Sequence, residues 1–295
     1  MIRTTKISKR MMTAGAVAIS CLIVFAGCGS SSSNGSGASS SGGLSVESAE
    51  KKGYLNIAIG NEPPYTKLSD DGTVTGAEPD VVRAVAKSMG IKSVKGTVSS
   101  YDGMIPGLNA NRWDVVAAGL FMKQSRCSQV IYTSPVVVST EAFAVKAGNP
   151  KQLTTIAAIQ KNPSLKVAVL NGGFEEGILK TKNIPDSQKV VVKDPTSGLE
   201  TVTSGRADAF LLPELSLKNL TLPSGLEVTA KIEDAPKTGS GAAFSKKNAA
   251  FAKEYNTALE KFKKTDEFKK ILDKWGFDAD AARSATVEEL CKVEG

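Results

Sequence analysis

Short apolar runs alternate with amphipathic stretches along the chain, and this alternation predicts strands and helices in turn. Strands are predicted at 53–60, 93–99, 114–118, 130–132, 166–170, 189–192, 207–212 and 242–244, with a longer β-rich run at 135–145. Helices are predicted at 78–89, 101–110, 152–160, 174–182, 196–204, 248–264 and 265–275. Two β-α-β series in one chain predict an α/β protein of two lobes, each built on a mainly parallel sheet flanked by helices, with a cleft between them.

The most informative stretch is 101–127, where a predicted helix and a buried strand lead into a turn. Tyr101 begins the helix, Phe121 follows the strand, and Arg126 lies in the turn. Because α/β folds bind small ligands at the carboxyl ends of their strands, these two rings and one cation are candidate ligand contacts. Taken alone, each residue has a plainer interpretation: Tyr101 and Phe121 as core residues, and Arg126 as a surface charge or a partner of Glu141.

The first 27 residues have the pattern of a secretory signal. Arg3, Lys6, Lys9 and Arg10 precede an apolar run that ends in Ala26-Gly27-Cys28. Small residues directly before a cysteine resemble a bacterial lipobox, which implies cleavage before Cys28 and its lipidation; an ordinary secretory peptide is the alternative. Residues 28–43 are rich in Ser and Gly and form a tether. The expected location is the outer face of the cytoplasmic membrane.

Composition excludes several functions. The 295 residues include no histidine, which removes Ser-His and Cys-His catalysis and the commonest metal ligand. The formal net charge is +7, but the four basic residues of the signal segment leave only +3 for residues 28–295. That balance is too weak to indicate nucleic acid as a partner. No metal and no cofactor is expected.

Two cysteines remain after Cys21 and Cys28 are assigned to the signal segment and the anchor. An even pair in an oxidising compartment predicts a disulfide between Cys127 and Cys291. Two unrelated buried thiols are the alternative.

Several motifs together resemble the solute-binding proteins that serve ABC importers of polar amino acids. They are Glu62-Pro63-Pro64-Tyr65, the run 101–108, Trp113-Asp114-Val115, Gly119-Leu120-Phe121 with Arg126, Gly205-Arg206-Ala207-Asp208-Ala209, and Leu272-Asp273-Lys274-Trp275-Gly276. The resemblance covers residues 53–277. It implies the type II periplasmic-binding-protein fold, a membrane permease as partner, and a monomer that is not an enzyme. It also implies two crossings between lobes, so that lobe 1 is 44–146 with 242–295 and lobe 2 is 147–241.

The departures from the amino-acid pattern narrow the expected ligand. Members that bind α-amino acids usually carry Ser or Thr at the position of Phe121 and an ammonium-binding Asp at that of Pro213. Rings hold a delocalised cation through cation–π attraction, whereas a simple ammonium needs acceptors. The pattern resembles the ectoine- and hydroxyectoine-binding subgroup. A polar amino acid (with Glu214 as the amine acceptor), a quaternary ammonium, or a dehydratase-like enzyme with Glu62 as general acid are the alternatives.

The same resemblance implies a role for each site residue. Glu62 accepts the ring N–H, Arg126 pairs with the ligand carboxylate, and three rings form an aromatic box. The remaining contacts to the carboxylate come from the second lobe. The box residues are Tyr65, Tyr101 and Phe121, and the second-lobe contacts are Asn171 and the backbone N–H groups of Gly172 and Gly173.

Overall fold

The computed structural model describes residues 43–294, so the predicted signal segment, Cys28 and nearly all of the tether lie outside the described residues. Two five-stranded sheets organise this part of the chain. The expected two-lobed α/β architecture is therefore confirmed. The first lobe contains the first sheet and the second lobe contains the second sheet.

The first sheet has the order β4-β1-β5-β14-β6. Strand β1 runs parallel to its neighbours β4 and β5, whereas β14 is antiparallel to β5 and β6. Its strands are β4 (Ser93–Val98), β1 (Tyr54–Ile59), β5 (Val115–Val116), β14 (Ala243–Ser245) and β6 (Val130–Tyr132). A small hairpin, β2 (Lys67–Leu68) and β3 (Val74–Thr75), follows β1.

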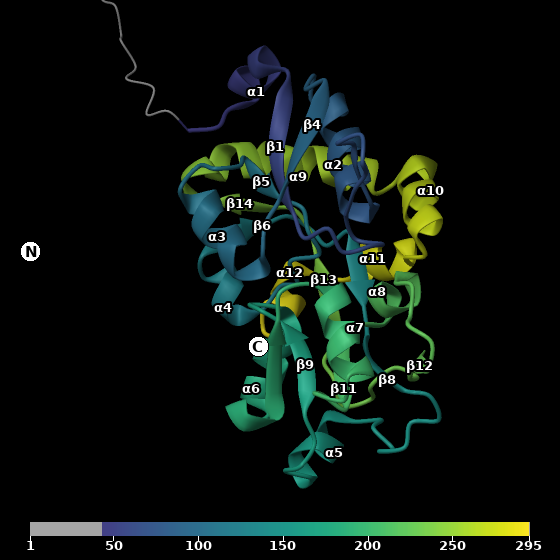
Figure 1. Ribbon diagram of the computed structural model, residues 1–295. Coiled ribbons are helices and arrows are strands. Elements are labelled where there is room, and N and C mark those ends of the chain that lie inside the picture. Colours follow the sequence, from purple (N-terminus) through teal and green to yellow (C-terminus); the bar gives the residue numbers. More distant parts are fainter. Residues whose placement is uncertain (1–42, 295) are drawn as a thin grey trace, which may run out of the picture. The chain divides into compact units, whose positions relative to one another are not determined.

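Helices cover the first sheet. The C-terminal helices, yellow in Figure 1, belong to this lobe although they are far from its first strands in the sequence. Helix α9 packs on α2 and β14, and α10 packs on α2. The helices are α1 (Val46–Lys52), α2 (Ala77–Ser88), α3 (Tyr101–Asn109), α4 (Gln124–Cys127), α9 (Ala249–Phe262), α10 (Asp266–Trp275), α11 (Ala279–Ser284) and α12 (Val287–Leu290), with a 3-10 turn η2 (Lys246–Asn248) before α9. The predicted apolar stripe of α9 is buried through Phe251, Tyr255 and Leu259, which explains why this amphipathic stretch folds as a helix here.

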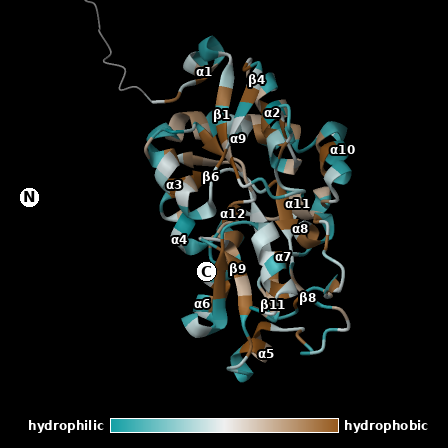
Figure 2. Ribbon diagram, viewed as in Figure 1, coloured by the Kyte–Doolittle hydropathy of each residue, from teal (hydrophilic) through white to brown (hydrophobic). Residues whose placement is uncertain are grey.

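The second sheet has the order β10-β9-β11-β8-β12 and is mixed, since β8 is antiparallel to both of its neighbours. Its strands are β10 (Lys189–Val192), β9 (Val167–Leu170), β11 (Ala209–Pro213), β8 (Glu141–Lys146) and β12 (Leu226–Val228). Its helices are α5 (Ile156–Lys161), α6 (Phe174–Thr181), α7 (Pro195–Thr203) and α8 (Glu214–Asn219), with a 3-10 turn η1 (Asp186–Gln188). Strands β9 and β11 are brown in Figure 2, because both faces of this sheet are covered.

The expected lobe boundary after residue 146 lies too late in the chain. Strand β8 pairs with β11 and β12 and therefore belongs to the second sheet. The chain leaves the first lobe along β7 (Val137–Ser139), which pairs with the returning strand β13 (Thr238–Ser240). The long apolar run at 135–145 concealed this break, because β7 and β8 are separated only by Thr140.

The disulfide between Cys127 and Cys291 is present, with the two Cα atoms 5.9 Å apart. It joins α4 to the end of α12. The backbone N–H of Gln124 also donates to the carbonyl of Val293. The C-terminal segment therefore fixes the short helix that carries Arg126.

Candidate ligand-binding site

A small enclosed cavity lies among side chains that come from both lobes. It is lined by Glu62, Tyr65, Tyr101, Gly119, Phe121, Arg126, Phe174, Glu175 and Pro213. Five of these were singled out from the sequence: Glu62, Tyr65, Tyr101, Phe121 and Arg126. They meet because each follows a strand of the first sheet or begins the next element, so all lie at one sheet edge.

Glu62 is 2% exposed and is held from both lobes. The Tyr101 hydroxyl lies 3.0 Å from Glu62 Oε2, and the hydroxyl of Ser216 in α8 donates to Glu62 Oε1. Burial raises the pKa of Glu62, and these two hydrogen bonds lower it in part. The Tyr101 hydroxyl also lies 3.2 Å from the Ala118 carbonyl, which fixes the ring in the cavity wall.

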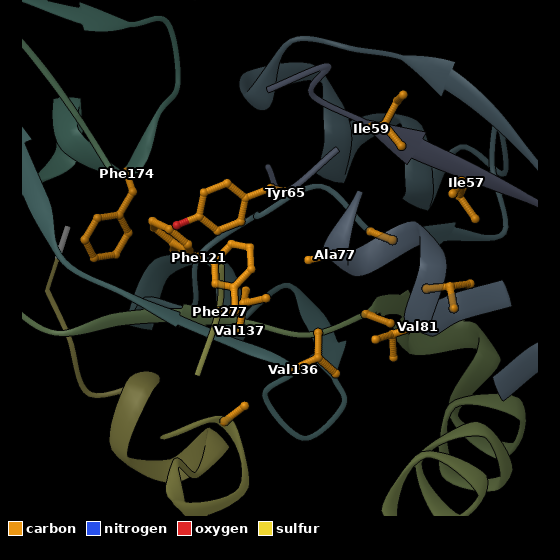
Figure 3. Close-up of a cluster of buried hydrophobic side chains, with 14 of the residues drawn as sticks. Ile57, Ile59, Tyr65, Ala77, Val81, Phe121, Val136, Val137, Phe174 and Phe277 are labelled. Atoms are coloured by element: carbon orange, nitrogen blue, oxygen red, sulfur yellow. The ribbon is translucent and has the colours of Figure 1, made fainter. Parts of the chain in front are cut away.

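The aromatic wall is a chain of edge-to-face contacts (Figure 3). The ring centroid of Phe121 is 5.5 Å from that of Tyr65 and 5.6 Å from that of Phe174. Phe277 supports Tyr65 from behind at 4.9 Å. The Tyr65 hydroxyl is buried without a well-formed hydrogen bond. These contacts hold the rings in position before any ligand enters.

Gly119 is required for this packing. Its φ of +66° lies in the left-handed region, and a Cβ at this position would come within 2.9 Å of the Tyr65 ring. The backbone after β5 therefore approaches Tyr65 as closely as it can.

Arg126 is 6% exposed and makes no ion pair among the described residues. Its Nη1 donates to the Phe121 carbonyl at 2.8 Å, and its Nη2 donates to the Gly172 carbonyl at 2.9 Å. Burial lowers the pKa of the guanidinium from its usual value. The fork is thus oriented by one carbonyl from each lobe, and its charge is not neutralised by a carboxylate contact.

Asn171, Gly172 and Gly173 lie beside the cavity but do not line it. The Asn171 amide donates to Asp102 Oδ2 at 2.8 Å. The N–H groups of Gly172 and Gly173 donate to Glu176 Oε2 and to the Leu170 carbonyl. In this structure, all three groups assigned to the ligand carboxylate are therefore engaged within the protein.

The ammonium position of the amino-acid pattern is occupied by Pro213, which lines the cavity. Glu214, weighed as a replacement acceptor, begins α8 and accepts from Thr140 and Lys218 instead. It is not a lining residue. Position 213 therefore supplies no acidic side chain, although Glu175 lines the same cavity and Glu141 lies opposite Pro213 in the sheet.

Sequence reasoning missed Phe174 and Glu175, which line the cavity from the first turn of α6. It considered Glu141 only as a partner of Arg126, with which it forms no ion pair; Glu141 is buried at the start of β8 close to Glu175. The sequence pattern that could have indicated a buried Glu141 is a charged residue at the edge of an apolar run, as in Glu141-Ala142-Phe143. Burial, together with the neighbouring Glu62, raises the pKa of Glu175 to about 7.

No group of three or more Cys, Asp or Glu within residues 43–294 is placed to hold a metal ion. None of the helices described here is long and apolar enough to cross a membrane.

A lined cavity between two α/β lobes is the arrangement found in two-lobed solute-binding proteins. The chain belongs to the bacterial extracellular solute-binding proteins, family 3, whose model matches residues 55–279. It is the substrate-binding protein of an ABC importer for amino acids or related solutes.

Individual relatives agree with this assignment. The chain is 31% identical to a probable amino-acid ABC transporter periplasmic-binding protein of Sinorhizobium fredii, over 85% of this chain and 87% of that protein. It is 41% identical to the crystal structure of EhuB in complex with hydroxyectoine, with a TM-score of 0.81, over 84% of this chain and 98% of that chain. The ancestral amino acid-binding protein AncCDT-1, a precursor of cyclohexadienyl dehydratase, shares the fold at 23% identity and a TM-score of 0.67, over 79% of this chain and 99% of that chain.

Proposed function

We propose that this protein binds ectoine or hydroxyectoine outside the cell and delivers it to a membrane permease. One observation carries the proposal: a buried arginine without an ion pair faces a wall of aromatic rings in one enclosed cavity. The 41% identity to EhuB in complex with hydroxyectoine supports the choice of ligand. The lipid anchor at Cys28 and the outer membrane face belong to the same proposal.

The ligand chemistry follows from the two ends of the cavity. Arg126 takes the carboxylate, because a guanidinium fork matches two carboxylate oxygens. Tyr65, Tyr101 and Phe121 take the delocalised cation, at about 0.5–2 kcal/mol for each favourable ring contact. Glu62 accepts one N–H of that cation. Pro213 has no side-chain acceptor at the position where α-amino-acid binders carry Asp, which disfavours α-amino acids.

Closure of the two lobes over the ligand completes the proposed mechanism. Three hydrogen bonds join the lobes beside the cavity: Arg126 to the Gly172 carbonyl, Asn171 to Asp102, and Ser216 to Glu62. Gly172 permits the close approach, since its φ is +66° and a Cβ would come within 2.6 Å of Asp102. These contacts exclude water and strengthen the charge pairing inside.

Titration calorimetry of the secreted protein tests the proposal with ectoine, hydroxyectoine, glycine betaine, glutamine and arginine. We expect binding of ectoine or hydroxyectoine at least about a hundredfold tighter than of either amino acid, a difference of about 2.7 kcal/mol. Tight binding of glutamine or arginine without binding of either ectoine compound contradicts the ligand assignment.

Phe121→Ala should weaken ectoine binding at least about fivefold, because a ring contact to a cation is worth about a kilocalorie per mole or more. Phe121→Leu is the matched control, since it keeps most of the apolar volume and removes only the π face. Both variants should bind more weakly than wild type while remaining folded by circular dichroism. Wild-type affinity in Phe121→Leu shows that the ring acts only by packing.

A further inference from the structure

Glu141 is an unusual residue within the described part of the chain. It begins β8 opposite Pro213, is 0% exposed, and neither of its carboxyl oxygens has a well-formed hydrogen bond. Glu175 and Thr238 lie beside it. An ionised carboxylate in such a place loses its hydration without compensation, which costs several kilocalories per mole. The carboxyl group is therefore kept neutral by a proton.

Glu175 is the ionisable neighbour of Glu141. It is 3% exposed and lines the cavity from the first turn of α6, where its own backbone N–H and the helix dipole favour negative charge. The titratable and charged groups that face this pair from other elements are Glu62, Tyr65, Tyr101, Lys123 and Arg126. Glu62 disfavours a second negative charge here, whereas Arg126 favours it.

Two buried carboxylates side by side do not both ionise at neutral pH. We infer that Glu141 and Glu175 together retain protons in the ligand site, and that an incoming cation with N–H donors expels one of them. The inference rests on the proposed function and extends it, because it makes Glu175 a second acceptor for the ligand and Glu141 the positioning residue behind it.

The step needs no change in covalent bonding beyond one proton transfer. The proton leaves the Glu175 carboxyl group for the solvent, and a ligand N–H donates to the carboxylate that remains. Glu141 keeps its own proton. A quaternary ammonium has no N–H to replace the lost proton, so the pair selects an amidinium-type cation over a trimethylated one.

The pH dependence follows from linkage. The pKa of Glu175 is raised to about 7 before binding, by burial first and by Glu62 next. A ligand cation lowers that pKa, so binding releases a proton and tightens as the pH rises. The affinity for the cation should increase by up to about tenfold per pH unit below pH 7 and level off above it.

Calorimetry with ectoine at pH 6.5, in buffers of different ionisation enthalpy, counts the protons released. Wild type should release between about half a proton and one proton for each ligand bound. Glu175→Gln should lower that number by more than half and weaken binding, whereas Glu141→Gln, which imitates the neutral carboxyl group, should keep most of the release. Glu78→Gln is the matched control, because Glu78 is equally buried but does not line the cavity. Equal proton release in wild type and Glu175→Gln overturns the inference.

A ligand-free measurement separates this inference from the choice of ligand. Infrared difference spectra at pH 7 should show a protonated-carboxyl band from Glu141. This band should be lost in Glu141→Gln and should remain in Glu78→Gln, where only the signal of the Glu78 carboxyl group is removed. If ectoine fails to bind while this band is lost as expected, the proposed ligand is wrong and the proton-bearing pair stands. A band unaffected by Glu141→Gln refutes the pair whatever the ligand.

Discussion

Replacing Arg126 with alanine should abolish most of the ligand affinity. The ligand carboxylate would then be buried without a partner, and removal of one member of a buried charge pair costs about 2–5 kcal/mol, or about 30-fold to several-thousand-fold in dissociation constant. Arg126 is almost fully buried and already oriented by the carbonyls of Phe121 and Gly172. Calorimetric titration with ectoine measures the loss.

Arg126→Lys is the control for this variant. It keeps the positive charge but not the planar fork, so an intermediate loss is expected. Arg126 also joins the lobes through its hydrogen bond to Gly172. An amide of ectoine, which lacks the carboxylate charge, separates carboxylate binding from lobe closure. If Arg126 binds the carboxylate, Arg126→Ala and the amide ligand should each weaken binding, with little further loss when combined. Independent, additive losses would assign Arg126 to lobe closure alone.

Removing the disulfide should produce the largest change in stability. The bond between Cys127 and Cys291 spans 164 residues of sequence. On the chain-entropy model, closing a loop of this length stabilises the fold by about 5 kcal/mol. Urea unfolding of the Cys127→Ser/Cys291→Ser double variant should therefore show a lower midpoint and a steeper slope, because the unfolded chain without the crosslink is less compact.

Reduced wild-type protein serves as the control for that variant and should show the same destabilisation. Because the bond fixes α4, which carries Arg126, ectoine affinity should also fall modestly in both. A loss of less than about 1 kcal/mol would mean that the two segments are held by other contacts, such as the Gln124 to Val293 hydrogen bond.

The strands and long helices could be predicted because their signals are local. The apolar run of β1 and the apolar stripe of α9 can each be recognised within a single segment of the chain. Strand β12 and helices α8, α11 and α12 were not predicted, because they are short and their hydrophobic residues contact distant parts of the chain. The first crossing between lobes was misplaced for a similar reason: pairing partners, and not the apolar character of β7 and β8, decide which sheet each strand joins.

The site divides in the same way. Glu62, Tyr65, Tyr101, Phe121 and Arg126 could be brought together from the sequence, since each lies at a strand end of the first lobe. Whether Asn171, Gly172 and Gly173 bind ligand stays a prediction, and here their polar groups bond within the protein. The cavity contribution of Phe174 and Glu175 depends on how the second lobe approaches the first, which no local pattern encodes.

A crystal structure of the secreted protein with hydroxyectoine tests the central claim most directly. We predict the ligand in the cavity lined by Tyr65, Tyr101 and Phe121, with its carboxylate on the Arg126 guanidinium and a ring N–H on Glu62. A ligand bound elsewhere, or bound in this cavity with its carboxylate away from Arg126, would contradict the account.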